Sequence, residues 1–258
     1  MQGILRRTLV VAASAVIATG TVTAASTADS IPTAHNTTTL NSVGALFFPS
    51  VFGLLPALGG PHFCSASVVH STTRDLVLTA AHCVYGTGFT IEFSPGFHDG
   101  KSPFGVWAVR RVYVPAAWKA SQDPKSDVAI LQMATHGGRH IEDVVGAHPL
   151  GVPSVGAQVT VDGYPAGSGG EAITCTNTLY DTDGYSSFNC HGYVDGVSGG
   201  PWYVGARVVG VTGGLHQGGC TEATSYSAPF GAGTAALLQR AEAGGSSDFA
   251  PAAGSDGC

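Results

Sequence analysis

The stretch VDGVSGGPW, residues 194–202, places a serine among glycines just before a Gly-Gly-Pro turn. The segment from Gly196 to Gly200 also fits the G-x-S-x-G pattern of α/β-hydrolases, in which a helix follows the nucleophilic serine. The residues after Ser198 are instead rich in β-branched and aromatic side chains, which favour a strand. That fold also needs an acid between the serine and a later histidine. His216 is the only histidine after Ser198, and no Asp or Glu lies between the two. We therefore expect Ser198 to be a nucleophile on a different fold.

Two upstream motifs supply the groups that activate a serine. Residues 78–83 read LTAAHC, and residues 126–131 read SDVAIL, so His82 ends one apolar stretch and Asp127 starts another. A carboxylate beside an apolar strand is costly without a partner. A histidine can take the proton of a serine hydroxyl and pass it to the leaving group, while an aspartate fixes the tautomer of that histidine. The order His82, Asp127, Ser198 is one in which such triads occur.

The glycines beside the serine have a predicted role of their own, because they allow the backbone to turn tightly. We expect the N–H groups of Gly196 and Ser198 to form an oxyanion hole, which stabilises the oxygen that becomes negative during acyl transfer.

Taken together, LTAAHC, SDVAIL and GVSGGPW resemble the three triad motifs of the chymotrypsin-like (trypsin-like) serine proteases. The similarity runs from about Val43 to the C-terminal helix and is closest to secreted trypsin-like peptidases of actinobacteria. The resemblance implies an all-β fold of two six-stranded antiparallel Greek-key β-barrels with a C-terminal helix. His82 and Asp127 would come from the first barrel and Ser198 from the second, with the site in the cleft between them.

The resemblance also implies substrate-binding residues. It places Thr212 next to Asp127, the glycines Gly213 and Gly214 along the substrate backbone, and Gly192 near the base of the specificity pocket. No acid occupies the position that gives trypsin its preference for Lys and Arg, so a basic P1 residue is not predicted. His191 or His216 could favour an acidic P1 residue, or these loop histidines could simply be solvated.

One position departs from the family pattern, because Val197 stands where Gly-Asp-Ser-Gly-Gly-Pro has its aspartate. In many animal members that aspartate pairs with the new N-terminus after activation, which valine cannot do. Either packing holds the loop or the site is not properly formed. We favour packing, because valine buries apolar surface without an ionic partner. Activation is then expected not to depend on a freed α-amino group.

The N-terminal sequence predicts export. Two arginines precede a short, alanine-rich apolar run and then small residues, which is typical of a signal peptide rather than a membrane anchor. The predicted divisions are a signal peptide (1–25), a propeptide or flexible arm (26–42), the protease domain (43–244) and a flexible tail (245–258). Within the domain we expect the first barrel at about 43–135, the second at about 145–233 and the helix at about 234–243.

Six cysteines in an exported chain predict disulfides. Cys175 and Cys190 lie symmetrically about the turn sequence Asp-Thr-Asp-Gly, and Cys64 and Cys83 lie symmetrically about Thr-Arg, so each pair could face across a hairpin. Cys220 would then pair with Cys258 and tie the tail to the body. The alternative pairs Cys190 with Cys220 and Cys175 with Cys258.

Composition narrows the function classes. The net charge is −6, only 11% of the residues are charged, and no basic patch indicates a nucleic-acid partner. His136 and His140 have metal-like spacing, but no cysteine or carboxylate cluster completes a site, so neither a metal nor a cofactor is predicted. We expect a monomeric secreted serine endopeptidase that acts on protein or peptide substrates through an acyl-enzyme. The alternatives are a non-catalytic binding module on a protease fold and an esterase with the same triad.

Overall fold

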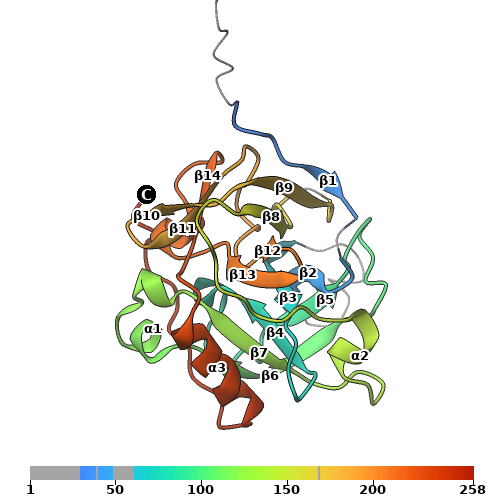
Figure 1. Cartoon of the computed structure of the whole chain (residues 1–258). Coiled ribbons are helices and arrows are strands. Elements are labelled where there is room, and N and C mark those ends of the chain that lie inside the picture. Colours follow the sequence, from blue (N-terminus) through green and yellow to red (C-terminus); the bar gives the residue numbers. More distant parts are fainter. Residues whose placement is uncertain (1–29, 39, 49–60, 168) are drawn as a thin grey trace, which may run out of the picture. The chain divides into compact units, whose positions relative to one another are not determined.

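A computed structural model describes residues 30–38, 40–48, 61–167 and 169–258 of the protein (Figure 1). The chain divides into two units, residues 1–30 and 31–258, and only Ser30 of the first is described. The predicted signal peptide, residues 1–25, therefore lies outside the described residues. Among the helices that are described, none is long and apolar enough to cross a bilayer.

The first half of the second unit is a closed antiparallel barrel with the strand order β2-β3-β4-β7-β6-β5. β6 alternates buried and exposed residues at its start, as expected where one face looks into the barrel and the other toward solvent. β2, β4 and β7 are buried throughout, because their outer faces are also covered. The strands are β2 (Val43–Phe47), β3 (His62–Val68), β4 (Leu76–Thr79), β5 (Glu92–Pro95), β6 (Trp107–Tyr113) and β7 (Ala129–Met133).

The remaining strands form two sheets, one of five strands in the order β1-β9-β8-β12-β13 and one of three in the order β10-β11-β14. Their apolar side chains form a second core around Trp202 and Phe188. The strands are β1 (His35–Thr37), β8 (Gln158–Gly163), β9 (Ala172–Thr178), β10 (Tyr180–Thr182), β11 (Tyr185–Asn189), β12 (Pro201–Val204), β13 (Arg207–Val211) and β14 (Thr224–Ser227).

The predicted all-β chymotrypsin-like class with a C-terminal helix is confirmed, and the structure adds detail to its second half. There the structure has eight strands in two sheets, where six strands in one barrel were predicted, and the two sheets meet at β13 and β14. Val211 donates its N–H to the Ser227 hydroxyl at 3.1 Å instead of to a backbone carbonyl. The next main-chain bond joins Gly213 N–H to the Tyr226 carbonyl at 2.9 Å. A serine side chain thus takes part in joining the two sheets.

Helices are few and short, and most lie at the ends of strands. The predicted C-terminal helix is present as α3, two residues earlier at its start, and it packs its buried Leu237 and Ala241 toward β6 and β7. The helical segments are η2 (Ala81–Cys83), α1 (Ala116–Ser121), η3 (Pro124–Ser126), α2 (Ile141–Val145), η4 (Leu215–Gly218) and α3 (Ala232–Glu242).

Both chain segments that were expected to be flexible contain ordered contacts. In the predicted arm, β1 pairs with β9, with His35 opposite Thr174. In the predicted tail, Ala250 is fully buried and exchanges two backbone hydrogen bonds with Gly86, at 2.8 and 2.9 Å. Pairing with residues distant in sequence sets these paths, which local composition does not encode.

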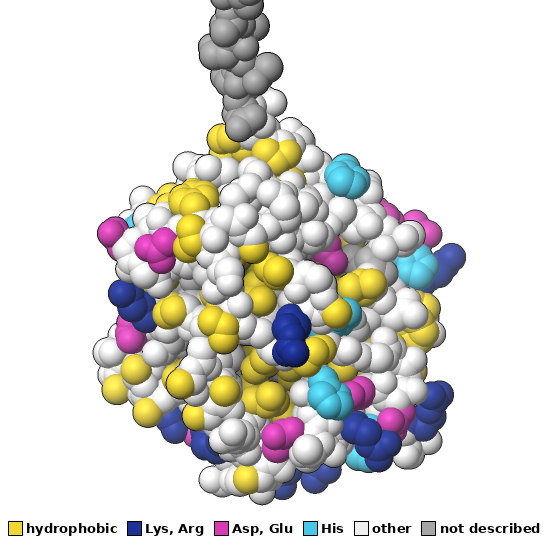
Figure 2. Space-filling view, in the orientation of Figure 1, with side chains coloured by type: hydrophobic (Ala, Val, Ile, Leu, Met, Phe, Trp, Pro, Cys, Tyr) yellow, Lys and Arg dark blue, Asp and Glu magenta, His cyan; other side chains and the backbone are white. Residues whose placement is uncertain are grey.

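The three disulfides follow the hairpin pairing. Cys64 is bonded to Cys83, Cys175 to Cys190, and Cys220 to Cys258. On the face of the molecule drawn in Figure 2, Lys and Arg side chains are scattered among acidic ones rather than gathered in one patch.

Candidate active site

A cavity of about 850 Å³ is lined by residues of both halves of the fold. The first barrel contributes His82 and Cys83, and the second half contributes Gly196, Ser198 and Thr212. The three residues of the predicted triad come from segments far apart in sequence, so the cavity is a product of the fold.

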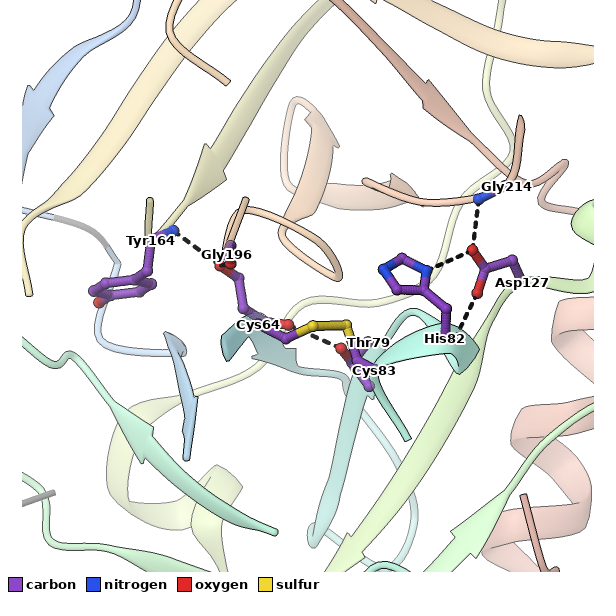
Figure 3. The surroundings of a disulfide bond; sticks show 9 residues. Cys64, Thr79, His82, Cys83, Asp127, Tyr164, Gly196 and Gly214 are labelled. Atoms are coloured by element: carbon purple, nitrogen blue, oxygen red, sulfur yellow. Dashed lines mark hydrogen bonds and ion pairs between the residues drawn. A yellow bond between two sulfur atoms is a disulfide. The ribbon is translucent and has the colours of Figure 1, made fainter. Parts of the chain in front are cut away.

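Strand pairing brings His82 and Asp127 together. β4 runs antiparallel to β7 with Thr79 opposite Ala129. His82 lies in η2, just after β4, and Asp127 lies just before β7, so both side chains leave the barrel at the same edge. The His82 imidazole donates from Nδ1 to Asp127 Oδ2 at 2.7 Å, and the His82 backbone N–H donates to Oδ1 at 2.9 Å (Figure 3).

Asp127 is fully buried and heavily hydrogen-bonded. Besides the two bonds from His82, its Oδ2 accepts the backbone N–H of Gly214 at 2.7 Å. Burial by itself raises the pKa of Asp127. The positive charge that His82 carries when protonated and the three hydrogen bonds lower this pKa by more than burial raises it. The net pKa therefore lies below the ordinary value. The carboxylate form is thus held in place.

This contact also determines what His82 can do. A carboxylate only accepts hydrogen bonds, so Nδ1 must carry the proton, and Nε2 of the neutral ring keeps a free lone pair. The side chain is 8% exposed, and among the described residues Nε2 has no hydrogen-bond partner. The imidazole is therefore arranged to accept a proton at the cavity.

Ser198 lies on the facing loop and is half-buried. Its carbonyl accepts the Ser65 N–H of β3 at 2.7 Å, and the following Gly199 donates its N–H to the Thr212 carbonyl at 2.7 Å. A Cβ on Gly199 would collide with the Thr79 hydroxyl, which is why glycine is required there. Within the described part, no hydrogen bond joins Ser198 Oγ to His82; such bonds are often long before substrate binds.

The predicted oxyanion-hole donors both lie in the loop that carries Ser198. The N–H groups of Gly196 and Ser198 find no acceptor among the described residues, whereas Val197 donates to the Val194 carbonyl. The Ala166 N–H binds the Asp195 carbonyl at 2.7 Å, which fixes the Asp195–Gly196 peptide with its N–H turned the other way. Gly196 has φ +93°, a conformation in which non-glycine residues are strained.

A buried serine of the first barrel supports this loop. The Ser65 hydroxyl donates to the Gly196 carbonyl at 2.9 Å and accepts the Tyr164 N–H at 2.8 Å (Figure 3 draws the chain of bonds between Tyr164 and Gly196). With its backbone bond to Ser198, Ser65 fixes the loop at two points. Its neighbour Cys64 is bonded to Cys83, the residue after His82.

Val197 is packed, as the sequence predicts. Its side chain is 4% exposed and belongs to the second apolar core, together with Val161 and Tyr193. A Cβ on Gly163 would lie 3.0 Å from the Val197 Cβ, so the two residues are in close contact. Apolar packing and the Ser65 bonds thus hold the loop in this chain.

The residues predicted to bind substrate are only partly brought together. Thr212 lines the cavity, but its hydroxyl accepts the Trp202 indole N–H at 3.0 Å, and among the described residues no hydrogen bond joins it to Asp127. Gly213 and Gly214 take the place beside Asp127, because they offer the close backbone approach that a side chain would block. Gly192 lies next to Ala34 and is not among the residues that line the cavity.

Three carboxylates, those of Asp195, Glu222 and Asp256, are among the described residues that line the cavity, and no described Lys or Arg lines it. Tyr193 lines the cavity, and its hydroxyl donates to the Val161 carbonyl at 2.6 Å. His191 lies 4.0 Å from Glu222, and both side chains are largely exposed. The two His/Cys clusters within the described chain contain only disulfide-bonded cysteines, which offer no thiolate to a metal.

Sequence reasoning missed two contributors. Ser65 looks like an ordinary strand residue, and only its distant partners reveal its role. Ala252, Ala253 and Asp256 of the C-terminal segment line the cavity, and the predicted bond between Cys220 and Cys258 was the available signal for that.

Comparisons with known proteins agree with this geometry. The family model described as Trypsin matches residues 55–230. The protease Anisep from Arthrobacter nicotinovorans is 26% identical, with a TM-score of 0.67 over 81% of this chain and 99% of its own. The thermostable serine protease AL20 from an extremophilic microorganism is also 26% identical, with a TM-score of 0.66 over 80% of this chain and 99% of its own.

Human heparin binding protein, at 16% identity and a TM-score of 0.59 over 77% of this chain and 91% of its own, shares the fold. Comparison with curated protein sequences finds no significant match. Because the family model spans more than half of the chain, and bacterial serine proteases align along most of it, the chain belongs to the trypsin family of chymotrypsin-like serine proteases.

Proposed function

We propose that the protein is a secreted serine endopeptidase that hydrolyses peptide bonds through an acyl-enzyme, with Ser198 as nucleophile, His82 as general base and acid, and Asp127 as the residue that orients His82. The observation that carries the proposal is the pair of His82 and Asp127, joined at 2.7 Å, whose free Nε2 lies in the same cavity as Ser198. Export is supported by three disulfides, which persist in oxidising compartments.

The steps follow from the groups present. Ser198 Oγ attacks the carbonyl carbon of the substrate while His82 Nε2 takes the hydroxyl proton. The carbonyl oxygen becomes negative and is stabilised by the N–H groups of Gly196 and Ser198, which are free to donate. The C–N bond then breaks, and His82 protonates the departing amine. Water, deprotonated by His82, hydrolyses the resulting ester and restores Ser198. The protein's own groups supply every proton transfer, so no cofactor is needed.

Labelling with a fluorophosphonate probe tests the proposal. We expect one covalent adduct per molecule, located on Ser198 by peptide mass. In His82→Ala the rate of labelling should fall by about 100-fold or more, because the general base is lost. His70→Ala, which removes an exposed histidine that pairs with Glu142, should label like the wild type. No adduct on folded, disulfide-intact protein would contradict the proposal and favour a non-catalytic binding module.

A matched pair of substrates separates the peptidase from an esterase. An ester and an amide with the same acyl group share the acyl-enzyme and differ in the leaving group. We expect turnover of both. Turnover of the ester alone would replace the peptidase proposal with an acyl-ester hydrolase that uses the same residues.

The Ser65 hydroxyl is expected to affect the rate through the oxyanion loop. Ser65→Ala removes the hydroxyl that hydrogen-bonds to the buried Gly196 carbonyl and to the Tyr164 N–H, at a cost of about 1–3 kcal/mol. Because the loop holds the transition state rather than the substrate, kcat should fall by about tenfold with little change in KM, well below the unfolding temperature. Ser67→Ala, which removes an equally buried hydroxyl from the same strand, is the control. A proportional loss in both variants would argue against a positioning role.

A further inference from the structure

The C-terminal strap, defined here as residues 249–258, begins at a fixed point on the first barrel. Just before it, the Asp248 carboxylate accepts hydrogen bonds from Lys119 at 2.6 Å and from Arg240 at 2.7 Å. Within it, Ala250 exchanges two backbone hydrogen bonds with Gly86, which follows His82 closely in sequence. The strap therefore starts beside the loop that carries the candidate base.

The middle of the strap is held by the side chain of Gln122. Its Nε2 donates to the Ala252 carbonyl at 2.7 Å, and its Oε1 accepts the Gly254 N–H at 2.7 Å. Gln122 ends α1 in a left-handed conformation, with φ 53°, a few residues before Asp127. The strap is thus fixed to the segment that leads to Asp127.

The end of the strap is fixed to the second half of the fold. Gln217 donates its Nε2–H to the Gly254 carbonyl at 2.9 Å, His216 donates from Nδ1 to the Asp256 carbonyl at 2.9 Å, and Cys258 is bonded to Cys220. His216 and Gln217 both have φ 51°, which is uncommon for non-glycine residues and persists where surrounding contacts impose it. In Figure 1 the chain returns from α3 to an end marked C, on the side of the view where β10 and β11 are labelled.

These contacts make the strap one wall of the cavity. Ala252, Ala253 and Asp256 line the same space as His82 and Ser198. The strap passes from Gly86 and Gln122 on the first barrel to η4 on the second half, so it connects the two sides of the cleft. A substrate chain laid through the cleft past Ser198 would meet backbone that is fixed by hydrogen bonds and by a disulfide.

We propose that the C-terminal strap is a specificity-determining wall that limits how many substrate residues bind on one side of the scissile bond. This inference rests on the proposed peptidase function and adds the class of substrate: peptides that extend freely on one side of the cleft only. The Cys220–Cys258 bond keeps the wall closed, because it joins the strap covalently to the second half of the fold.

The test compares two series of peptides that share one cleaved bond and are lengthened by up to four residues on either the N-terminal or the C-terminal side. The measured quantity is the ratio of kcat/KM for the longest peptide to that for the shortest. In the wild type we expect added residues to leave kcat/KM unchanged in one of the two series, so that the ratio for that series stays near 1. In a variant that combines Cys220→Ser with deletion of residues 252–258, the same ratio should rise about tenfold, because added residues gain new hydrogen bonds.

Two milder variants keep the inference testable if the shortened protein does not fold. Gln122→Ala removes both hydrogen bonds to the strap but leaves the disulfide, and the ratio should rise severalfold. Cys220→Ser combined with Cys258→Ser keeps the full chain and should act in the same direction. Gln158→Ala, which removes an exposed glutamine that binds Thr178, is the matched control and should leave the ratio unchanged.

An unchanged ratio in every strap variant, with Ser198 still labelled by the fluorophosphonate, would overturn the inference and leave the strap a stabilising element only. A wild type that neither labels nor cleaves any peptide would overturn the proposed function, and this inference with it.

Discussion

Replacement of Asp127 by asparagine should lower kcat/KM by about 10⁴-fold, the size of effect known when the triad carboxylate of a serine protease becomes an amide. The carboxylate accepts three N–H groups, two of them backbone groups. An amide has one accepting oxygen and one donating nitrogen. Its nitrogen must therefore face either the His82 N–H or the site shared by His82 Nδ1 and the Gly214 N–H. In the second case the amide nitrogen donates to His82 Nδ1. The imidazole proton then lies on Nε2, and Nε2 can no longer accept the proton of Ser198.

The measurement is kcat/KM on a peptide substrate, with circular dichroism to show that the fold is kept. Asp123→Asn is the matched control: Asp123 caps η3 by accepting the Lys125 N–H, and asparagine caps equally well. It lies close to Asp127 in sequence but makes no bond to His82. A loss below about tenfold in Asp127→Asn would show that His82 is oriented by other contacts.

The same carboxylate links stability to pH. Because the pKa of Asp127 in the folded protein lies below its ordinary value, its contribution to stability is fully present above the unfolded-state value of about 3.9. That contribution is lost as the pH falls through the lower folded-state pKa. Asp127→Asn should therefore reduce the acid-dependent part of the unfolding free energy in this range.

Local sequence patterns accounted for the parts of the site that strands and hairpins position. His82 and Asp127 flank two paired strands, so their motifs and the pairing of β4 with β7 are enough to bring them together. Cys175 and Cys190 flank a single hairpin, so their bond follows from a turn sequence.

Contacts between distant segments could not be predicted in this way. Ser65 acts through Gly196 and Tyr164, about a hundred residues away or more, and no local pattern marks a serine that binds two remote backbone groups. Thr212 was expected beside Asp127, but the chain turns so that Gly213 and Gly214 approach the carboxylate. The strap has the composition of a flexible tail, and its path depends on Gln122 and Gln217, whose side chains give no sign of it in sequence.

Val197→Asp should both unfold and inactivate the protein, although aspartate is the usual residue at this position in the family. Val197 is 4% exposed, in a core with Val161 and Tyr193, and the backbone of Gly163 lies against it. The described side chains of that cluster are all hydrophobic, so none of them supplies a positive charge. An ionised carboxylate buried there without a partner should cost about 3–5 kcal/mol, a large fraction of the stability of an ordinary domain.

The rate of labelling should fall by more than the loss of folded protein explains. Displacement of Val197 also moves Gly196 and Ser198, its two neighbours in the oxyanion loop. The free energy of unfolding in denaturant and the rate of fluorophosphonate labelling measure the two effects. Val155→Asp, the same change at a side chain that is 69% exposed, should alter neither by more than about 0.5 kcal/mol. If Val197→Asp were instead stable and active, the carboxylate would have found a cation, and a freed N-terminus would be the first group to examine. The packing explanation for this loop would then be wrong, because a cation would lie close enough to position 197 to pair with an aspartate there.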